Sequence, residues 1–204
     1  MSHKCFISFK KEDTIYRDII ADLLGEENIT AKSLDEEIDS DNIDYVMQQI
    51  RQKFMNKTTV TIFLIGEHSS ENEGYDFYGL KNAFIKRELQ ATLYDGKGFR
   101  RSGLLGIVLP NMYDKIYDGQ YYCEQCQENH SRVLINDNTV IKEFSANYYL
   151  KPINKGCHNA YDEDGRFCVL VKYDDFIKAP NFYIDKAFDK TQQEISNYVH
   201  WRNL

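Results

Sequence analysis

The run Val60–Ile65 (VTIFLI) constrains the fold of this 204-residue chain more than any other stretch. Its residues do not alternate between apolar and polar, and this lack of alternation is typical of a parallel strand that is buried on both faces. Such a strand needs parallel neighbours and helices that cover both sides of the sheet. We therefore predict an α/β domain in which Val60–Ile65 is the central strand.

Further strands and helices alternate along the chain around this central strand. Apolar runs predict four more strands, at residues 4–9, 29–34, 104–109 and 168–173. Apolar residues at helical spacing predict helices that follow Asp13 and Asp41, a helix over residues 80–94 and a closing helix from Tyr183. Asp13 has the residue type of an N-cap, and Gly25 that of a helix stop. This order predicts a flavodoxin-like, doubly wound parallel sheet of five strands.

Residues 111–167 interrupt this regular order. They are rich in Tyr, Asn, Asp and Cys and contain few periodic apolar runs. We expect one domain over residues 1–204, with 111–167 as a cysteine-containing insertion before the last strand.

Glu88 is the one acid at an unexpected place on the helix predicted over residues 80–94. Phe84 and Ile85 precede it by one helical turn, and Ala91 and Thr92 follow it by one turn. We therefore expect Glu88 on the buried face, and Lys86 and Gln90 at more solvated positions. Burying an unpaired carboxylate is costly, so Glu88 needs a partner or a function. A structural explanation is a boundary carboxylate paired with Arg87, Lys81 or a backbone amide.

Charge and missing motifs exclude several classes of function. The net charge of -7 argues against a general nucleic-acid surface. The chain has neither a G-x-x-x-x-G-K-[ST] phosphate loop nor a G-x-G-x-x-G turn after its first strand, which argues against Walker-type nucleotide hydrolysis and hydride transfer. No apolar stretch approaches the length of a membrane span, and the first residues lack a signal-peptide core, so we expect a cytoplasmic protein without a membrane partner.

The cysteines of the expected insertion have the spacing of metal ligands. Cys123 and Cys126 form a C-x2-C pair, and Cys157 with His158 follows later in the same stretch. A structural zinc bound by Cys123, Cys126, Cys157 and His158 is one interpretation, with His130 as an alternative fourth ligand. Reduced cysteines in a polar subdomain are the other. Residues 157–160 read Cys-His-Asn-Ala, so the second half of such a site is not another C-x2-C pair.

In the order of its segments, the chain resembles the TIR-like proteins of bacterial Thoeris anti-phage defence systems. The similar segments are HKCFISFKKED, DNIDYVMQQI, TTVTIFLIG, IKRELQATL, GLLGIVLP and KYDDFIKAPNFYIDKAFDK. The cysteine-bearing insertion is most similar to the branch that attaches ADP-ribose to free histidine.

The resemblance implies an enzyme with NAD+ as its substrate. It places the catalytic carboxylate at Glu88, since the helix after the third strand carries that residue in TIR-type NAD-cleaving enzymes. The residues that it implies for substrate binding are Ser8, Phe9, Lys10, Asp35, Glu36 and Phe84.

The implied reaction releases nicotinamide and transfers ADP-ribose to an acceptor, giving histidine-ADP-ribose or a cyclic ADP-ribose isomer. Such a product would act on a downstream effector protein as a second messenger. Two alternatives remain open, namely a non-catalytic TIR-like module that associates with itself or a partner, and a sensor that binds a small ligand without turnover.

Overall fold

The computed structural model describes residues 3–30, 38, 40, 42–70, 84–96, 98–152 and 163–202. Within them, four parallel strands form one sheet in the order β1-β2-β3-β6. These strands are β1 (Cys5–Ser8), β2 (Val60–Ile65), β3 (Gly103–Val108) and β6 (Val169–Lys172). Every residue of β2 is buried, which confirms the prediction of a central strand.

The second predicted strand, at residues 29–34, lies mostly outside the described residues. Ile29 forms a parallel bridge with Cys5, and Cys5 also pairs with Val60 on β2. Ile29 and Thr30 therefore lie beside β1, on the edge away from β2, where a flavodoxin-like order places its second strand. The described sheet has four strands rather than the five that we predicted.

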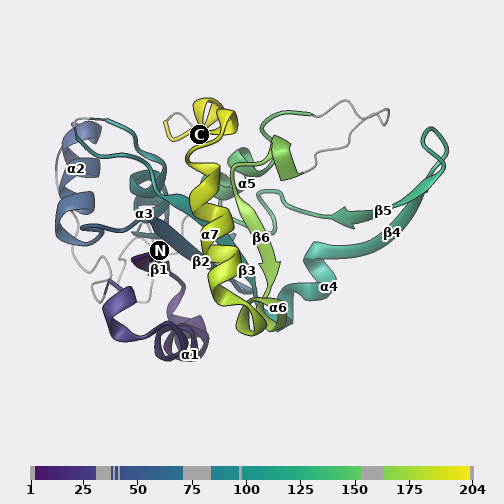
Figure 1. The fold of residues 1–204 in the computed structure, drawn as a ribbon, viewed down its shortest axis with the longest axis horizontal. Coiled ribbons are helices and arrows are strands. Elements are labelled where there is room, and N and C mark those ends of the chain that lie inside the picture. The colour runs from purple at the N-terminus through teal and green to yellow at the C-terminus, as the bar shows by residue number, and fades with distance from the viewer. Residues whose placement is uncertain are drawn as a thin grey trace.

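Helices cover both faces of this sheet (Figure 1). On one face, residues of α1 (Thr14–Leu24), α6 (Tyr173–Lys178) and α7 (Pro180–Lys190) share an apolar cluster with Ile62 and Leu64 of β2. On the other, α3 (Phe84–Leu93) and α5 (Lys142–Tyr148) pack around Phe63 and Ile65. A further cluster joins α2 (Ile43–Lys53) to α3 and to Phe6 of β1. Alternate residues of β2 thus enter the two main clusters, as expected for a strand covered on both sides.

The region 111–167 contains both core and exposed structure. Phe144 and Tyr148 of α5 are buried in the same cluster as Phe63. The antiparallel pair β4 (Tyr117–Cys123) and β5 (Glu128–Val133) instead projects away from the sheet (Figure 1). Short 3-10 helices complete the described chain at Lys11–Asp13, Glu26–Asn28, Pro110–Met112, Glu163–Gly165 and Glu194–Tyr198, and α4 spans Tyr113–Ile116. In the described part of the chain, every helix is too short or too polar to cross a lipid bilayer.

Gly103, the first residue of β3, allows the backbone of α7 to approach the sheet. A Cβ atom at this position would overlap the backbone carbonyl of Ala187. We expect Gly103→Ala to lower the free energy of unfolding by about 1 to 2 kcal/mol, because α7 has to move outward. Urea unfolding followed by circular dichroism measures this loss. An unchanged unfolding midpoint would contradict the close packing of α7 on β3.

Candidate functional site

The candidate site lies at the carboxyl ends of β1 and β2. Ser8 is the last residue of β1 and pairs in register with Phe63 of β2. Gly66 follows the last residue of β2 directly. In open parallel sheets, ligands bind in the crevice beyond these strand ends. Two buried acids, Glu88 and Asp13, contact this edge from α3 and from the start of α1.

Glu88 contacts the sheet through a direct hydrogen bond. The Ser8 hydroxyl donates to Glu88 Oε2 over 2.7 Å, and both side chains are buried. The contact joins residues 80 positions apart in the sequence, and it fixes the carboxylate against the end of β1. Two residues of the predicted site are therefore neighbours in the structure.

The surroundings of Glu88 explain why it is buried. Ile85, Ala91 and Thr92 of the same helix are buried, as we predicted. We had considered Arg87 as a partner that would pair with Glu88. The Arg87 guanidinium instead donates a hydrogen bond to Gln90 Oε1 over 3.1 Å. Lys81 lies outside the described residues.

The expectation that Gln90 is solvated was wrong. Its amide is buried and donates to Glu143 Oε1 over 3.0 Å. Glu143 belongs to α5, so Gln90 helps to hold two helices of the same face together. Lys86 is partly exposed, as expected, and lies 3.8 Å from the same Glu143 oxygen.

Asp13 is a second acid at this edge, and sequence reasoning assigned it another role. It occupies the N-cap position of α1, but its side chain makes no capping hydrogen bond. Its carboxylate lies against Gly66 instead, where a Cβ atom would overlap it. Asp13 is only 5% exposed, and its Oδ2 atom has no hydrogen-bond partner among the described residues.

The environment of Asp13 disfavours its charged form. Burial, together with the neighbouring charge of Glu12, raises the pKa of Asp13 from 3.8 to about 6, although His68 and Lys10 act in the opposite direction. The sequence signal that could have located Asp13 is the glycine directly after the central strand, because a missing side chain there makes room for another group.

The other predicted binding residues are placed differently. Lys10 is buried beside this edge, and its backbone carbonyl accepts a hydrogen bond from the Asp13 amide. The Phe9 ring is half-buried, with the Arg17 guanidinium 5.2 Å from its centroid. Phe84 is half-buried at the start of α3 and packs against the cluster that contains Phe6. Asp35 and Glu36 lie outside the described residues.

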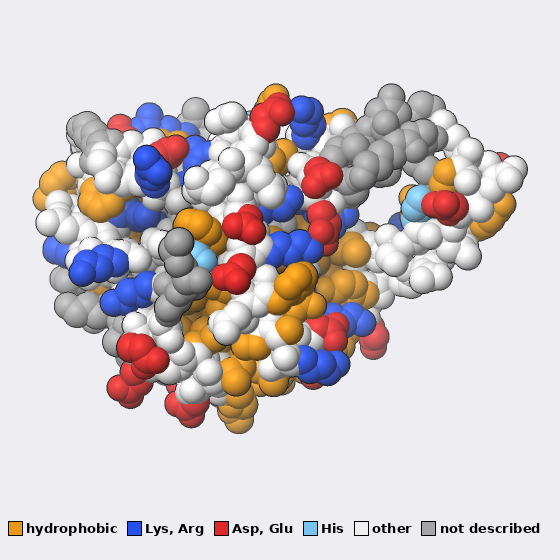
Figure 2. Space-filling view, in the orientation of Figure 1, with side chains coloured by type: hydrophobic (Ala, Val, Ile, Leu, Met, Phe, Trp, Pro, Cys, Tyr) orange, Lys and Arg blue, Asp and Glu red, His pale blue; other side chains and the backbone are white. Residues whose placement is uncertain are grey.

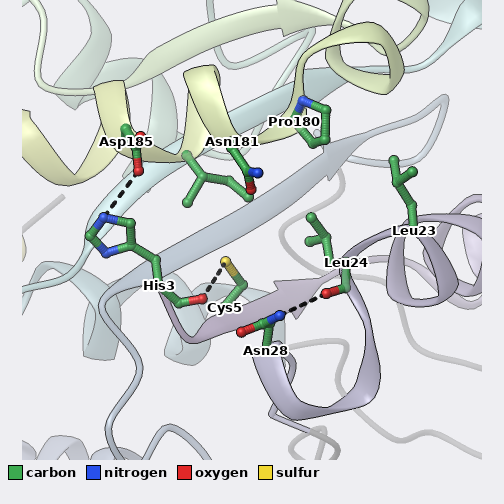
Figure 3. A pocket seen from close by; sticks show the side chains of 9 residues that line it. His3, Cys5, Leu23, Leu24, Asn28, Pro180, Asn181 and Asp185 are labelled. Atoms are coloured by element: carbon green, nitrogen blue, oxygen red, sulfur yellow. Dashed lines mark hydrogen bonds and ion pairs between the residues drawn. The ribbon is translucent and has the colours of Figure 1, made fainter. Parts of the chain in front are cut away.

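A cavity of about 430 Å³ lies elsewhere, at the other end of β1 (Figure 3). Its lining includes Cys5, the first residue of that strand. Polar groups of the lining contact one another, as His3 Nε2 lies 3.2 Å from Asp185 Oδ1 and the Asn28 amide donates to the Leu24 carbonyl. Neither Glu88 nor Asp13 lines this cavity, so we do not assign the candidate functional site to it.

The predicted metal ligands are brought together in part. Ligand atoms of Cys123, Cys126 and His130 lie within 4.8 Å of one another, so these three residues can hold a metal ion. His130, the alternative ligand, therefore joins the C-x2-C pair. Cys157 and His158 lie outside the described residues, so their part in a zinc site stays a prediction.

Comparison with known proteins relates the first half of the chain to a family. Residues 6–113, more than half of the chain, match the family model of the Thoeris protein ThsB, TIR-like domain. The matched stretch contains Ser8, Asp13 and Glu88, and it ends before β4. No curated protein matches the chain.

Proposed function

Because the chain belongs to the family of TIR-like domains of the Thoeris protein ThsB, we propose that it cleaves NAD+ at the nicotinamide–ribose bond in anti-phage defence. The family is one of NAD-processing enzymes. The observation that carries the proposal is the buried carboxylate of Glu88, which accepts a hydrogen bond from Ser8 at the carboxyl end of β1.

Glu88 supplies the negative charge that this bond cleavage needs. When the bond between ribose C1′ and the nicotinamide nitrogen breaks, its electron pair moves to the pyridinium ring, and nicotinamide leaves as a neutral molecule. Positive charge then develops on C1′ and on the ribose ring oxygen. A carboxylate held in place beforehand stabilises this charge and accepts hydrogen bonds from the ribose hydroxyls. The hydroxyl of Ser8 keeps the carboxylate oriented while the charge develops.

The ADP-ribosyl group then passes to an acceptor. If the acceptor is free histidine, an imidazole nitrogen forms a new bond to C1′, the ring releases its N–H proton, and the product is histidine-ADP-ribose. An attacking group of the same ADP-ribose would instead give a cyclic isomer. Either product is a small nucleotide that can reach a separate effector protein. In this proposal the chain is a single domain, with residues 111–167 as an insertion.

Product analysis tests the proposal directly. We expect purified protein to release nicotinamide from NAD+ and, with histidine present, to form a product of the mass of histidine-ADP-ribose, both detected by mass spectrometry. Incubation with and without phage-infected lysate tests for a required activator. Absence of nicotinamide under all of these conditions would overturn the proposal in favour of a non-catalytic module. NAD+ binding without nicotinamide release would favour a sensor.

A further inference from the structure

The hairpin of β4 and β5 lacks a hydrophobic core of its own. Its base is anchored, because Tyr117 and Val133 pack against the cluster around Phe144. Beyond the base, every residue from 118 to 132 is exposed except Cys123, Cys126 and His130. Figure 2 shows this arm projecting from the body of the protein. A two-stranded hairpin in water is marginally stable on its own, so its end needs another source of stability.

The three less exposed residues converge at the end of the hairpin. Cys123 closes the ladder opposite Glu128, and His130 lies two residue pairs back, opposite Tyr121. The distance from Cys126 Sγ to His130 Nε2 is 2.9 Å, and the ligand atoms of all three residues lie within 4.8 Å of one another. The side chains that face one another at this end are thus two thiols and an imidazole.

The turn that joins the strands has a conformation that is costly without support. Gln127, directly after Cys126, has a φ of 58°. Residues other than glycine rarely adopt this left-handed conformation, and it persists only where the surroundings enforce it. The Gln127 amide also donates to the Cys123 carbonyl over 2.8 Å, which closes the turn around the C-x2-C pair. The backbone therefore bends sharply at the point that brings the two cysteines together.

We propose that Cys123, Cys126 and His130 bind a structural Zn²⁺ ion that holds the end of this hairpin together. In a tetrahedral zinc site, bonds of about 2.3 Å to sulfur and about 2.0 Å to nitrogen separate the ligand atoms by about 3.5 to 3.8 Å. Cys126 Sγ and His130 Nε2 are 2.9 Å apart and no two ligand atoms are more than 4.8 Å apart, so small side-chain movements suffice to reach these separations. Two thiolates and a neutral imidazole also balance the charge of Zn²⁺, and thiolates favour zinc over magnesium or calcium.

The inference does not depend on the proposed NAD+ cleavage. The three ligands lie outside the stretch that matches the family model, and the hairpin projects away from the four-stranded sheet against which Glu88 of α3 packs. The three ligands leave one position of a tetrahedral site for water or a fourth donor.

Metal analysis of the full chain, purified without chelator, tests the site. We expect about one zinc per chain. Replacing the zinc with Co²⁺ should give absorption bands of thiolate-to-cobalt charge transfer. Cys126→Ser and His130→Ala should each weaken Co²⁺ binding at least about tenfold, whereas Asn129→Ala, an exposed neighbour on β5, should bind as the wild type does.

Hydrogen exchange separates loss of the metal from loss of the fold. A chelator should speed exchange of the β4 and β5 amides and leave the amides of β2 protected, because the core does not include the end of the hairpin. Zinc well below one per chain together with no cobalt bands would overturn the proposal. Undiminished Co²⁺ binding in both ligand variants would also overturn it, because the metal would then lie elsewhere.

Discussion

Glu88→Gln is expected to lower the rate of nicotinamide release from NAD+ by at least about a hundredfold and to leave the fold intact. Glutamine has almost the same shape as glutamate and can still accept the hydrogen bond from Ser8. It lacks the negative charge that stabilises the positive ribose, and removal of one preorganised electrostatic group from a transition state costs about 10²- to 10³-fold in rate. The loss should appear in kcat, because the charge on the sugar develops in the transition state.

Two further variants show whether the loss is specific to this carboxylate. Glu143→Gln makes the same chemical change at another buried acid, which contacts Gln90 on the face of the sheet covered by α3 and α5. It should retain nicotinamide release. Ser8→Ala removes the hydroxyl that orients Glu88 and should slow release less than Glu88→Gln, by about tenfold. A Glu88→Gln protein with wild-type kcat would contradict the catalytic assignment, whatever the other two variants do.

The sequence predicted those parts of the fold that follow from local pattern. Val60–Ile65 could be assigned because a strand buried on both faces is apolar along its whole length, and its bounds in the structure are the same. The buried position of Glu88 followed equally from helical spacing. The burial of Gln90 did not, because it depends on Glu143 of α5, which lies 53 residues further along the chain. Periodicity within one helix contains no information about the polar partner that another helix presents.

Residues of the site could be predicted where their type suits one structural role. They could not be predicted where their type suits two roles. Aspartate before a helix is a good N-cap, so local rules gave Asp13 that role. In the structure its side chain turns to the open space above Gly66, which only the folded sheet creates. The place of His130 was likewise left open by the sequence. The antiparallel register of β4 and β5 brings it back toward Cys126, four residues earlier.

The buried charge of Asp13 lowers the free energy of unfolding at neutral pH, and this loss of stability can be measured. Its pKa is raised from 3.8 to about 6, so the unfolded chain releases this proton at lower pH than the folded protein does. As the pH rises from about 4 to 6, the unfolded state therefore binds fewer protons than the folded state, and the contribution of Asp13 to stability falls. Above about pH 6, the folded protein carries the full cost of a buried charge. Below about pH 4 the carboxyl is neutral in both states and the cost disappears.

Asp13→Asn is consequently expected to stabilise the protein at pH 7.5. A shift from 3.8 to about 6 corresponds to about 1 to 3 kcal/mol, with the lower end applying where solvent in the crevice screens the charge. Urea unfolding at pH 7.5, 6.0 and 4.5 should show that this gain in the free energy of unfolding becomes smaller as the pH falls. At low pH, Asp13 of the wild type is protonated and no longer carries a buried charge. Lys10 and His68 lower the pKa of Asp13, so His68→Gln should raise the pKa of Asp13 further and increase the cost of its buried charge. A gain that stays the same at all three pH values would mean that asparagine stabilises by packing, and that Asp13 is not a buried charge at the edge of the sheet.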